Sequence, residues 1–197
     1  MNDMIKGKKI LISMGGTYEP IDSVRGITNK SSGKMGLALA KEAYIRGADV
    51  TLVVANVSVH ISYLFDVINV ETSMEMNNTI LSLVEDYDIF ISTAAVSDFE
   101  FIDKFDKKLD SSSSLFLNLK PTTKIIRQIK RINPDIFLVG FKAEFNISRD
   151  DLICCAKKQI NNAGTDLVVA NDISQDSCHF GSDDNEVLRW LDRKSVV

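Results

Sequence analysis

Residues 9–36 read KILISMGGTYEPIDSVRGITNKSSGKMG, and this stretch contains the pattern that decides the fold. The apolar run over residues 9–14 predicts a short buried strand, which a GGT turn follows at once. A helical spacing of apolar residues then begins near Gly33 and ends before Gly47, a residue favoured just past the end of a helix. The segment therefore predicts a strand, a tight turn and a helix in succession.

The same alternation continues through the rest of the chain. Helices are expected from Ser73 to about residue 85, from Pro121 to about residue 131, and over residues 148–161, because Ser is a favoured N-cap and Pro suits a first helical turn. Further strands are expected at residues 49–55, 67–70, 88–93, 115–119, 136–141, 166–170 and 186–191. The alternation predicts a three-layer α/β fold with a doubly wound, mostly parallel, Rossmann-like sheet. In such sheets ligands bind beyond the carboxyl ends of the strands.

The composition indicates one ordinary globular domain. The chain has 197 residues, of which 45% are hydrophobic and 25% charged, and its formal net charge is −4. This balance argues against the basic surface of a nucleic-acid-binding protein, and no apolar run reaches the ~20 residues that a membrane helix needs. We expect a single domain over residues 1–197, in the cytoplasm, without nucleic-acid or membrane partners. Residues 100–114 are rich in Asp, Lys and Ser and predict a mobile flap within that domain.

The strongest local signal for a binding site is TNKSSGKMG at residues 28–36. Small residues at a helix start leave backbone N–H groups uncovered, and the helix dipole adds partial positive charge, which suits a phosphate. An ordinary serine-rich cap is the alternative, although Gly15 and Gly16 after the first strand favour the phosphate site. The segment is not a P-loop, because Met35 stands where a hydroxyl residue is needed. A dinucleotide fingerprint is disfavoured, since the second strand ends at Asn56 without a carboxylate.

Four other positions allow both a functional and a purely structural interpretation. Asp98 follows an apolar strand and turn, where it could bind a divalent cation or a ribose hydroxyl, or simply cap the turn. Lys107 and Lys108 in the flap could close over a triphosphate and neutralise its charge, or remain solvated. Phe141 at a strand end could stack on a base or belong to the core.

Five motifs taken together resemble the phosphopantothenate–cysteine ligase family of coenzyme A biosynthesis. In chain order they are GGTYEPIDSVRGITNKSSGKMG, STAAVSDF, VGFKAE, VVANDIS and FGSDDNEV, and the likeness extends from about residue 8 to about residue 191. The resemblance implies a homodimeric ligase that joins 4′-phosphopantothenate to L-cysteine with Mg²⁺ and a nucleotide. The SSGKMG form is similar to that of members using CTP, with ATP as the alternative. In that family the substrate carboxylate attacks the α-phosphate, giving an acyl-nucleotidylate and pyrophosphate, and the cysteine amine then displaces the nucleotide.

The resemblance also implies roles for individual residues. Asn29 matches the family asparagine that hydrogen-bonds the acyl intermediate, and Lys108 matches the flap lysine, so both are expected to be catalytic. Arg25 is expected to reach the phosphate of phosphopantothenate across a dimer interface. The other expected substrate-binding residues are Ser31, Ser32, Gly33 and Ala95. The expected nucleotide-binding residues are Gly15, Gly16, Thr17, Gly33, Met35, Gly36, Ala94, Asp98, Lys108 and Phe141, with Asp98 also as a magnesium ligand.

The sequence departs from the family pattern at positions that are expected to contact the triphosphate. Asp110 stands where a second flap lysine is usual. Gln159 and Ala163 stand where two lysines are common, unless a one-residue shift lets Lys158 serve. The alternatives are a catalytically weakened nucleotide-binding module and an NAD(P)-binding oxidoreductase, which the missing acid after the second strand disfavours. Many family members carry an N-terminal flavin-dependent decarboxylase domain, so this chain is expected to be monofunctional or one half of a longer protein.

Overall fold

A seven-stranded sheet forms the centre of the computed structural model, which describes residues 4–103, 105–110, 112, 114–174 and 186–191. The strand order is β11-β10-β9-β6-β1-β4-β5, and every neighbouring pair is parallel except β10 and β11. The strands are β1 Lys9–Met14, β4 Asp49–Val54, β5 Asp66–Asn69, β6 Ile89–Ser92, β9 Phe137–Glu144, β10 Leu167–Asp172 and β11 Leu188–Leu191. From β1 the chain first adds β4 and β5 on one side of the sheet and then β6, β9, β10 and β11 on the other. This arrangement confirms the doubly wound α/β prediction.

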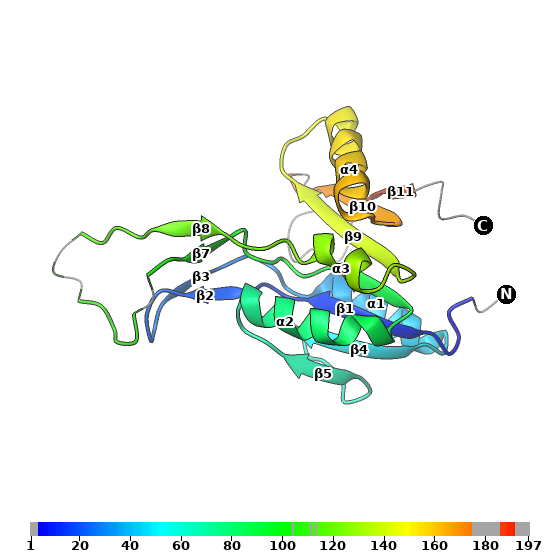
Figure 1. Ribbon diagram of the computed structural model, residues 1–197, viewed down its shortest axis with the longest axis horizontal. Coiled ribbons are helices and arrows are strands. Elements are labelled where there is room, and N and C mark those ends of the chain that lie inside the picture. Colours follow the sequence, from blue (N-terminus) through cyan, green and yellow to red (C-terminus); the bar gives the residue numbers. More distant parts are fainter. Residues whose placement is uncertain (1–3, 104, 111, 113, 175–185, 192–197) are drawn as a thin grey trace.

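Helices cover both faces of this sheet (Figure 1). They are α1 Lys34–Ile45, α2 Ser73–Leu83, α3 Ile126–Ile132 and α4 Arg149–Ala163, and a 3₁₀ turn, η1 Val84–Asp86, extends α2. Along β1, Ile10 and Ile12 pack in the cluster with α1, whereas Leu11 packs in the cluster with α2 and α3. This alternation is the two-residue period of a strand buried on both faces. No helix in the described part of the chain has the length and apolarity needed to cross a membrane.

The helix ends follow local chemistry. The Thr72 side chain, not that of Ser73 as predicted, caps α2 by accepting from the Glu75 N–H at 3.1 Å. Ser73 instead donates its own N–H to the buried Glu19 carboxylate at 2.8 Å. The Ser148 side chain caps α4 by accepting from the Asp151 N–H at 3.1 Å, and α4 covers most of the helix predicted at residues 148–161.

Two short antiparallel ribbons form an arm that projects from the sheet (Figure 1). We use "the arm" for the β2–β3 hairpin and the β7–β8 ribbon together with the described residues that join their strands. The strands are β2 Tyr18–Pro20, β3 Gly26–Thr28, β7 Phe99–Phe101 and β8 Leu119–Pro121. The β2–β3 hairpin was not predicted, because three-residue strands carry no periodic signal. The described residues of the flap expected at residues 100–114 belong to the arm, and the mobility of the flap stays a prediction.

The arm also corrects two sequence predictions. A strand at residues 115–119 and a helix beginning at Pro121 are wrong, because β8 is Leu119–Pro121 and α3 begins at Ile126. Pro121 pairs with Phe99 in the two-stranded ribbon. Proline has no N–H to donate, so an exposed edge position of this kind tolerates it.

Candidate functional site

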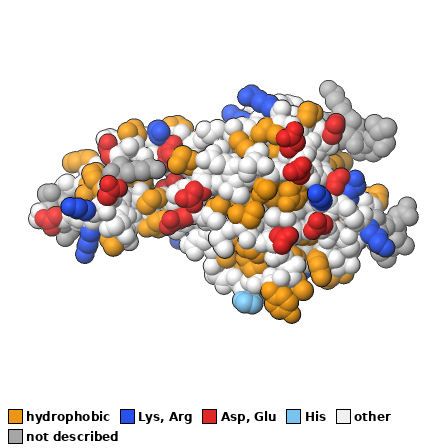
Figure 2. Space-filling view, turned by 60° about the horizontal axis from the view of Figure 1, so that its bottom comes forward, with side chains coloured by type: hydrophobic (Ala, Val, Ile, Leu, Met, Phe, Trp, Pro, Cys, Tyr) orange, Lys and Arg blue, Asp and Glu red, His pale blue; other side chains and the backbone are white. Residues whose placement is uncertain are grey.

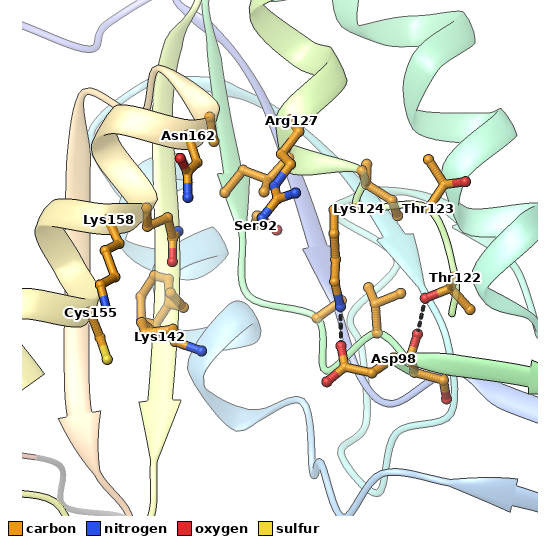
Figure 3. A pocket seen from close by; sticks show the side chains of 18 of the residues that line it. Ser92, Asp98, Thr122, Thr123, Lys124, Arg127, Lys142, Cys155, Lys158 and Asn162 are labelled. Carbon is orange, nitrogen blue, oxygen red and sulfur yellow. Dashed lines mark hydrogen bonds and ion pairs between the residues drawn. The ribbon is translucent and has the colours of Figure 1, made fainter. Parts of the chain in front are cut away.

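A cavity of about 430 Å³ opens beyond the carboxyl ends of β6 and β9, between α3 and α4 (Figure 3). Its walls combine the loop after β6, the residues preceding and starting α3, the end of β9 and the inner side of α4. This is the place where an open parallel sheet binds ligands. The volume is that of a typical small-molecule site.

The cavity carries an excess of positive charge. Its lining includes the cations Lys124, Arg127, Lys142 and Lys158 and the carboxylates Asp98 and Glu144. Lys124 pairs with Asp98, and Lys142 pairs with Glu144 at 2.9 Å. Within the described residues, Arg127 and Lys158 have no ion-pair partner of their own. Two uncompensated cations in a concave site favour an anionic ligand.

Three of the predicted nucleotide contacts line this cavity. They are Ala94, Asp98 and Phe141. The other predicted nucleotide contacts do not line it, and their contact with a nucleotide stays a prediction. Lys108 in particular lies exposed on the arm.

Asp98 does not sit in a cluster of metal ligands. Its side chain is 69% exposed and engages Lys124. No group of three or more His, Cys, Asp or Glu side chains in the described part of the chain could hold a metal ion. The two carboxylates of the cavity, Asp98 and Glu144, are each paired with a lysine, and such a donor set does not make a protein-only magnesium site.

The loop after β6 is fixed by Thr17. The Thr17 hydroxyl donates to Ser97 Oγ at 3.1 Å and accepts from the Ser97 N–H at 2.9 Å. Thr17 is fully buried, so its side chain is committed to this loop and does not face the cavity. Its effect on a ligand would therefore pass through Ser97 and its neighbour Asp98, both of which line the cavity.

Asn29 joins the same loop from the other side. Its side-chain Nδ2 donates to the Ala95 carbonyl at 2.9 Å, and Asn29 is exposed. Ala94, which precedes Ala95 in the chain, lines the cavity. The structure thus brings together the predicted residues Asn29 and Ala95, and it places them next to the cation-rich cavity.

The glycines of the predicted phosphate cradle are buried against protein. A Cβ on Gly15 would lie 2.7 Å from the Asn56 carbonyl oxygen, and one on Gly16 would lie 2.6 Å from that of Asn29. A Cβ on Gly36 would lie 2.5 Å from Met14 Cβ. Close packing of neighbouring segments is therefore enough to require glycine here, and the contact of these glycines with a nucleotide stays a prediction.

The start of α1 keeps part of the expected character. Gly33 precedes the helix at φ 79°, in the left-handed region that favours glycine, and makes no side-chain cap. Ser31, Ser32 and Met35 are half-buried, while Gly33 itself is buried. The first amides of any helix lack intrahelical acceptors, so phosphate binding here remains possible chemistry and stays a prediction.

Arg25 lies on the arm, away from the lining of the cavity. Its guanidinium donates to the Asp22 carboxylate at 3.0 and 2.5 Å and to the Leu109 carbonyl at 2.9 Å. The Arg25 guanidinium, followed by the Leu109 N–H, holds the pKa of Asp22 far below its usual range. The structure does not test the predicted contact of Arg25 with a substrate phosphate.

Several cavity residues were missed by sequence reasoning. Lys124 and Arg127 lie beside a segment whose helix start was misplaced, so no strand-end argument could find them. The departures from the family pattern were better signals, because Gln159, Ala163 and Lys158 all line the cavity. Two of the expected lysine positions thus face the cavity with neutral side chains.

A family model described as "DNA/pantothenate metabolism flavoprotein C-terminal domain" matches residues 5–196. The chain belongs to this family. The match covers nearly the whole chain, including the arm, the cavity and the Asn29 segment.

Individual relatives agree with this assignment. The "Coenzyme A biosynthesis bifunctional protein CoaBC" of Thermococcus kodakarensis is 48% identical over 186 residues, which cover 93% of this chain and 45% of that protein. The chain therefore spans slightly less than half the length of this relative.

Solved structures agree as well. The crystal structure of the DNA/pantothenate metabolism flavoprotein from Streptococcus pneumoniae has a TM-score of 0.80 at 27% identity, covering 94% of this chain and 93% of that one. The C-terminal domain of CoaBC has a TM-score of 0.76 at 29% identity, covering 96% of this chain and 88% of that one.

Proposed function

We propose that this domain condenses 4′-phosphopantothenate with L-cysteine at the expense of CTP, giving 4′-phosphopantothenoylcysteine, CMP and pyrophosphate. The family assignment and the relative named for coenzyme A biosynthesis support the pathway. The observation that carries the proposal is the loop after β6. Through Ala94 it borders a cavity with two uncompensated cations, and through the Ala95 carbonyl it holds Asn29.

The reaction needs an activated carboxylate. A carboxylate oxygen of phosphopantothenate attacks the α-phosphorus of CTP, and the bond to pyrophosphate breaks. The amine of cysteine then attacks the acyl carbon, CMP leaves with the bonding electrons, and the amine loses a proton. Holding the reactants together in attack geometry contributes roughly 7–11 kcal/mol to such condensations. Asn29 would donate to the acyl-cytidylate, a role in keeping with its exposed position beside Ala95.

The cations of the cavity suit the charge of a triphosphate. Arg127 and Lys158 would supply the positive charge that the family places at the positions of Gln159 and Ala163. Lysine and arginine are protonated at neutral pH, so both would oppose the negative charge of the phosphates. Mg²⁺ would arrive with the nucleotide and screen its phosphate charge, and Asp98 is the cavity carboxylate that we propose as its protein ligand.

The arm supports the proposal that the protein acts as a homodimer. Its exposed apolar side chains are Val24, Ile27, Phe99, Ile102, Leu115, Phe116 and Leu119, and Phe116 is 89% exposed. Figure 2 shows apolar and charged side chains mixed along this projection. Exposed apolar side chains of this number on one projection favour a protein interface. In a dimer, Arg25 and Lys108 of the arm could serve a site to which the partner contributes. The cytoplasmic location stays a prediction.

One assay tests the function. Pyrophosphate release by the purified protein is measured with CTP or ATP, with and without phosphopantothenate and cysteine. We expect release that requires phosphopantothenate, is faster with CTP, and yields 4′-phosphopantothenoylcysteine only when cysteine is present. Nucleotide binding without phosphopantothenate-dependent release would instead indicate a weakened nucleotide-binding module.

A further inference from the structure

The buried carboxylate of Asp22 connects the turn of the β2–β3 hairpin to the β7–β8 side of the arm. Its side chain is 0% exposed. Asp22 Oδ1 accepts the N–H groups of Val24 and Arg25, each at 2.9 Å. Asp22 Oδ2 accepts the Arg25 guanidinium and the Leu109 N–H, the latter at 3.0 Å. One carboxylate therefore collects donors from two segments more than eighty residues apart.

The peptide at Leu109 is held from both of its polar groups. Its N–H reaches Asp22, and its carbonyl accepts from Arg25 Nη2 at 2.9 Å. A second tether lies nearby, where the Phe105 N–H donates to the Ile21 carbonyl at 3.3 Å. Lys108 is the residue immediately before Leu109, so this contact fixes the chain from which Lys108 extends.

The same contact also orients Arg25. A guanidinium has five N–H donors in one plane. Three of them are used by Asp22 and Leu109, which leaves the two on Nη1 for another acceptor. A guanidinium fixed in this way loses less side-chain entropy when it binds an anion.

We propose that Asp22 is a positioning residue that holds Arg25 and Lys108 as one unit, so that both present their charges to the substrates in a fixed geometry. The proposal rests on the proposed function, which gives Arg25 the phosphate of phosphopantothenate and Lys108 the triphosphate. Asp22 itself is buried and touches no reacting group. It acts on both substrates only through these two neighbours.

The test replaces Asp22 by asparagine. The asparagine of Asp22→Asn has one amide nitrogen where aspartate has an oxygen. In one orientation this nitrogen faces the Leu109 N–H and the guanidinium, and in the other it faces the N–H groups of the hairpin. Either way, two hydrogen-bond donors face each other and one set of bonds is lost. Asp88→Asn is the matched control, because Asp88 also accepts a lysine and a backbone N–H but lies at the opposite end of the sheet. Both variants are first checked for cooperative thermal unfolding. Leu109→Pro, which removes the same N–H from the arm side, replaces Asp22→Asn if the latter does not fold.

Two readouts are taken on the full chain. Hydrogen exchange of the segment that contains Leu109, measured without ligands, reports whether Asp22 holds the arm. Steady-state pyrophosphate release reports KM and kcat. We expect Asp22→Asn to speed exchange of that segment and to raise the KM for both CTP and phosphopantothenate by about tenfold, the loss typical of one charged hydrogen bond, with a smaller change in kcat. Asp88→Asn should change neither the exchange of that segment nor the KM for either substrate.

The outcomes separate the two proposals. Unchanged exchange at Leu109, or KM values equal to those of Asp88→Asn, would overturn the positioning role. A raised KM for only one substrate would overturn the claim that the two residues act as one unit. Absence of pyrophosphate release from the unaltered protein would refute the proposed function, and the exchange measurement would then still decide whether Asp22 holds the arm.

Discussion

The side-chain amide of Asn29 donates a hydrogen bond to the backbone carbonyl of Ala95 at 2.9 Å. The two residues are 66 positions apart in sequence, and this contact brings the segment before α1 to the loop that borders the cavity. The Ala95 carbonyl also accepts the Thr17 N–H at 3.2 Å, so the turn after β1 meets the same loop. Two of the family-like motifs, the one over residues 15–36 and STAAVSDF, therefore meet at one peptide group.

Asn29→Asp tests the role of this contact. The carboxylate cannot donate to the Ala95 carbonyl or to an acyl-cytidylate, but it leaves the cavity and its cations unchanged. We expect pyrophosphate formation to be retained while transfer to cysteine falls by about a hundredfold, the effect of losing one preorganised donor. Separate assays of pyrophosphate and of the cysteine adduct measure the two steps. Asn78→Asp on the exposed surface of α2 is the control, and equal loss of both steps in Asn29→Asp would contradict the assignment.

Thr17→Val tests how the cavity loop is held. Valine matches the shape of threonine but leaves the Ser97 N–H without its buried acceptor. We expect the free energy of unfolding to fall by about 1–3 kcal/mol. The affinity for CTP should fall as well, because Ser97 and Asp98 line the cavity. Denaturant unfolding and calorimetric titration measure the two effects.

Thr51→Val is the matched control for that variant. Thr51 is also buried, and its hydroxyl accepts from the Tyr87 hydroxyl at 2.8 Å, far from the cavity lining. The Thr51→Val variant should have a lower free energy of unfolding but an unchanged affinity for CTP. Equal loss of affinity in both variants would show that Thr17 has no particular connection to the site.

Arg127→Ala and Lys158→Ala test the charge of the cavity. Each removes one uncompensated cation from an exposed position, so we expect the Kd for CTP to rise by roughly three- to tenfold per variant. The loss should shrink as ionic strength rises, because salt screens the interaction in the unaltered protein. Arg131→Ala, on α3 but outside the cavity lining, is the control. Equal affinity of all three variants for CTP would show that the triphosphate does not bind in this cavity.

Asp172 provides a prediction about pH. The Ser174 N–H, with a smaller contribution from that of Asn146, holds the pKa of Asp172 below its usual value. A depressed folded-state pKa stabilises the fold fully above the unfolded value of about 3.9, and this contribution disappears as pH falls through the folded pKa. Asp172→Asn should therefore lower the melting temperature by a constant amount between about pH 5 and 7, and the difference should shrink below about pH 4. A difference in melting temperature that did not shrink below about pH 4 would contradict this prediction.

The sequence determined the central sheet because periodicity and caps are local properties. The β-branched runs of β1 and β4 and the glycine after α1 specify a strand, a helix and a strand whatever their neighbours are. Likewise, α4 begins where a helix was predicted, because the Ser148 cap needs only the next turn of its own helix. Family-like motifs also indicated the loop containing Ala94 and Ala95 and the position of Asn29.

Only the tertiary structure decided what those residues contact. Asp22 was given no role by the sequence, yet its buried carboxylate accepts the Leu109 N–H from 87 positions away, which no local pattern could reveal. A side chain at Gly15 would meet the Asn56 carbonyl and one at Gly36 would meet Met14, and only the packed chain places those neighbours there. Arg127 and Lys158 became a pair only when α3 and α4 met across the cavity. Contacts between distant segments depend on how the elements pack, and packing is a property of the whole chain, whereas the strand and helix periods are written in each short segment.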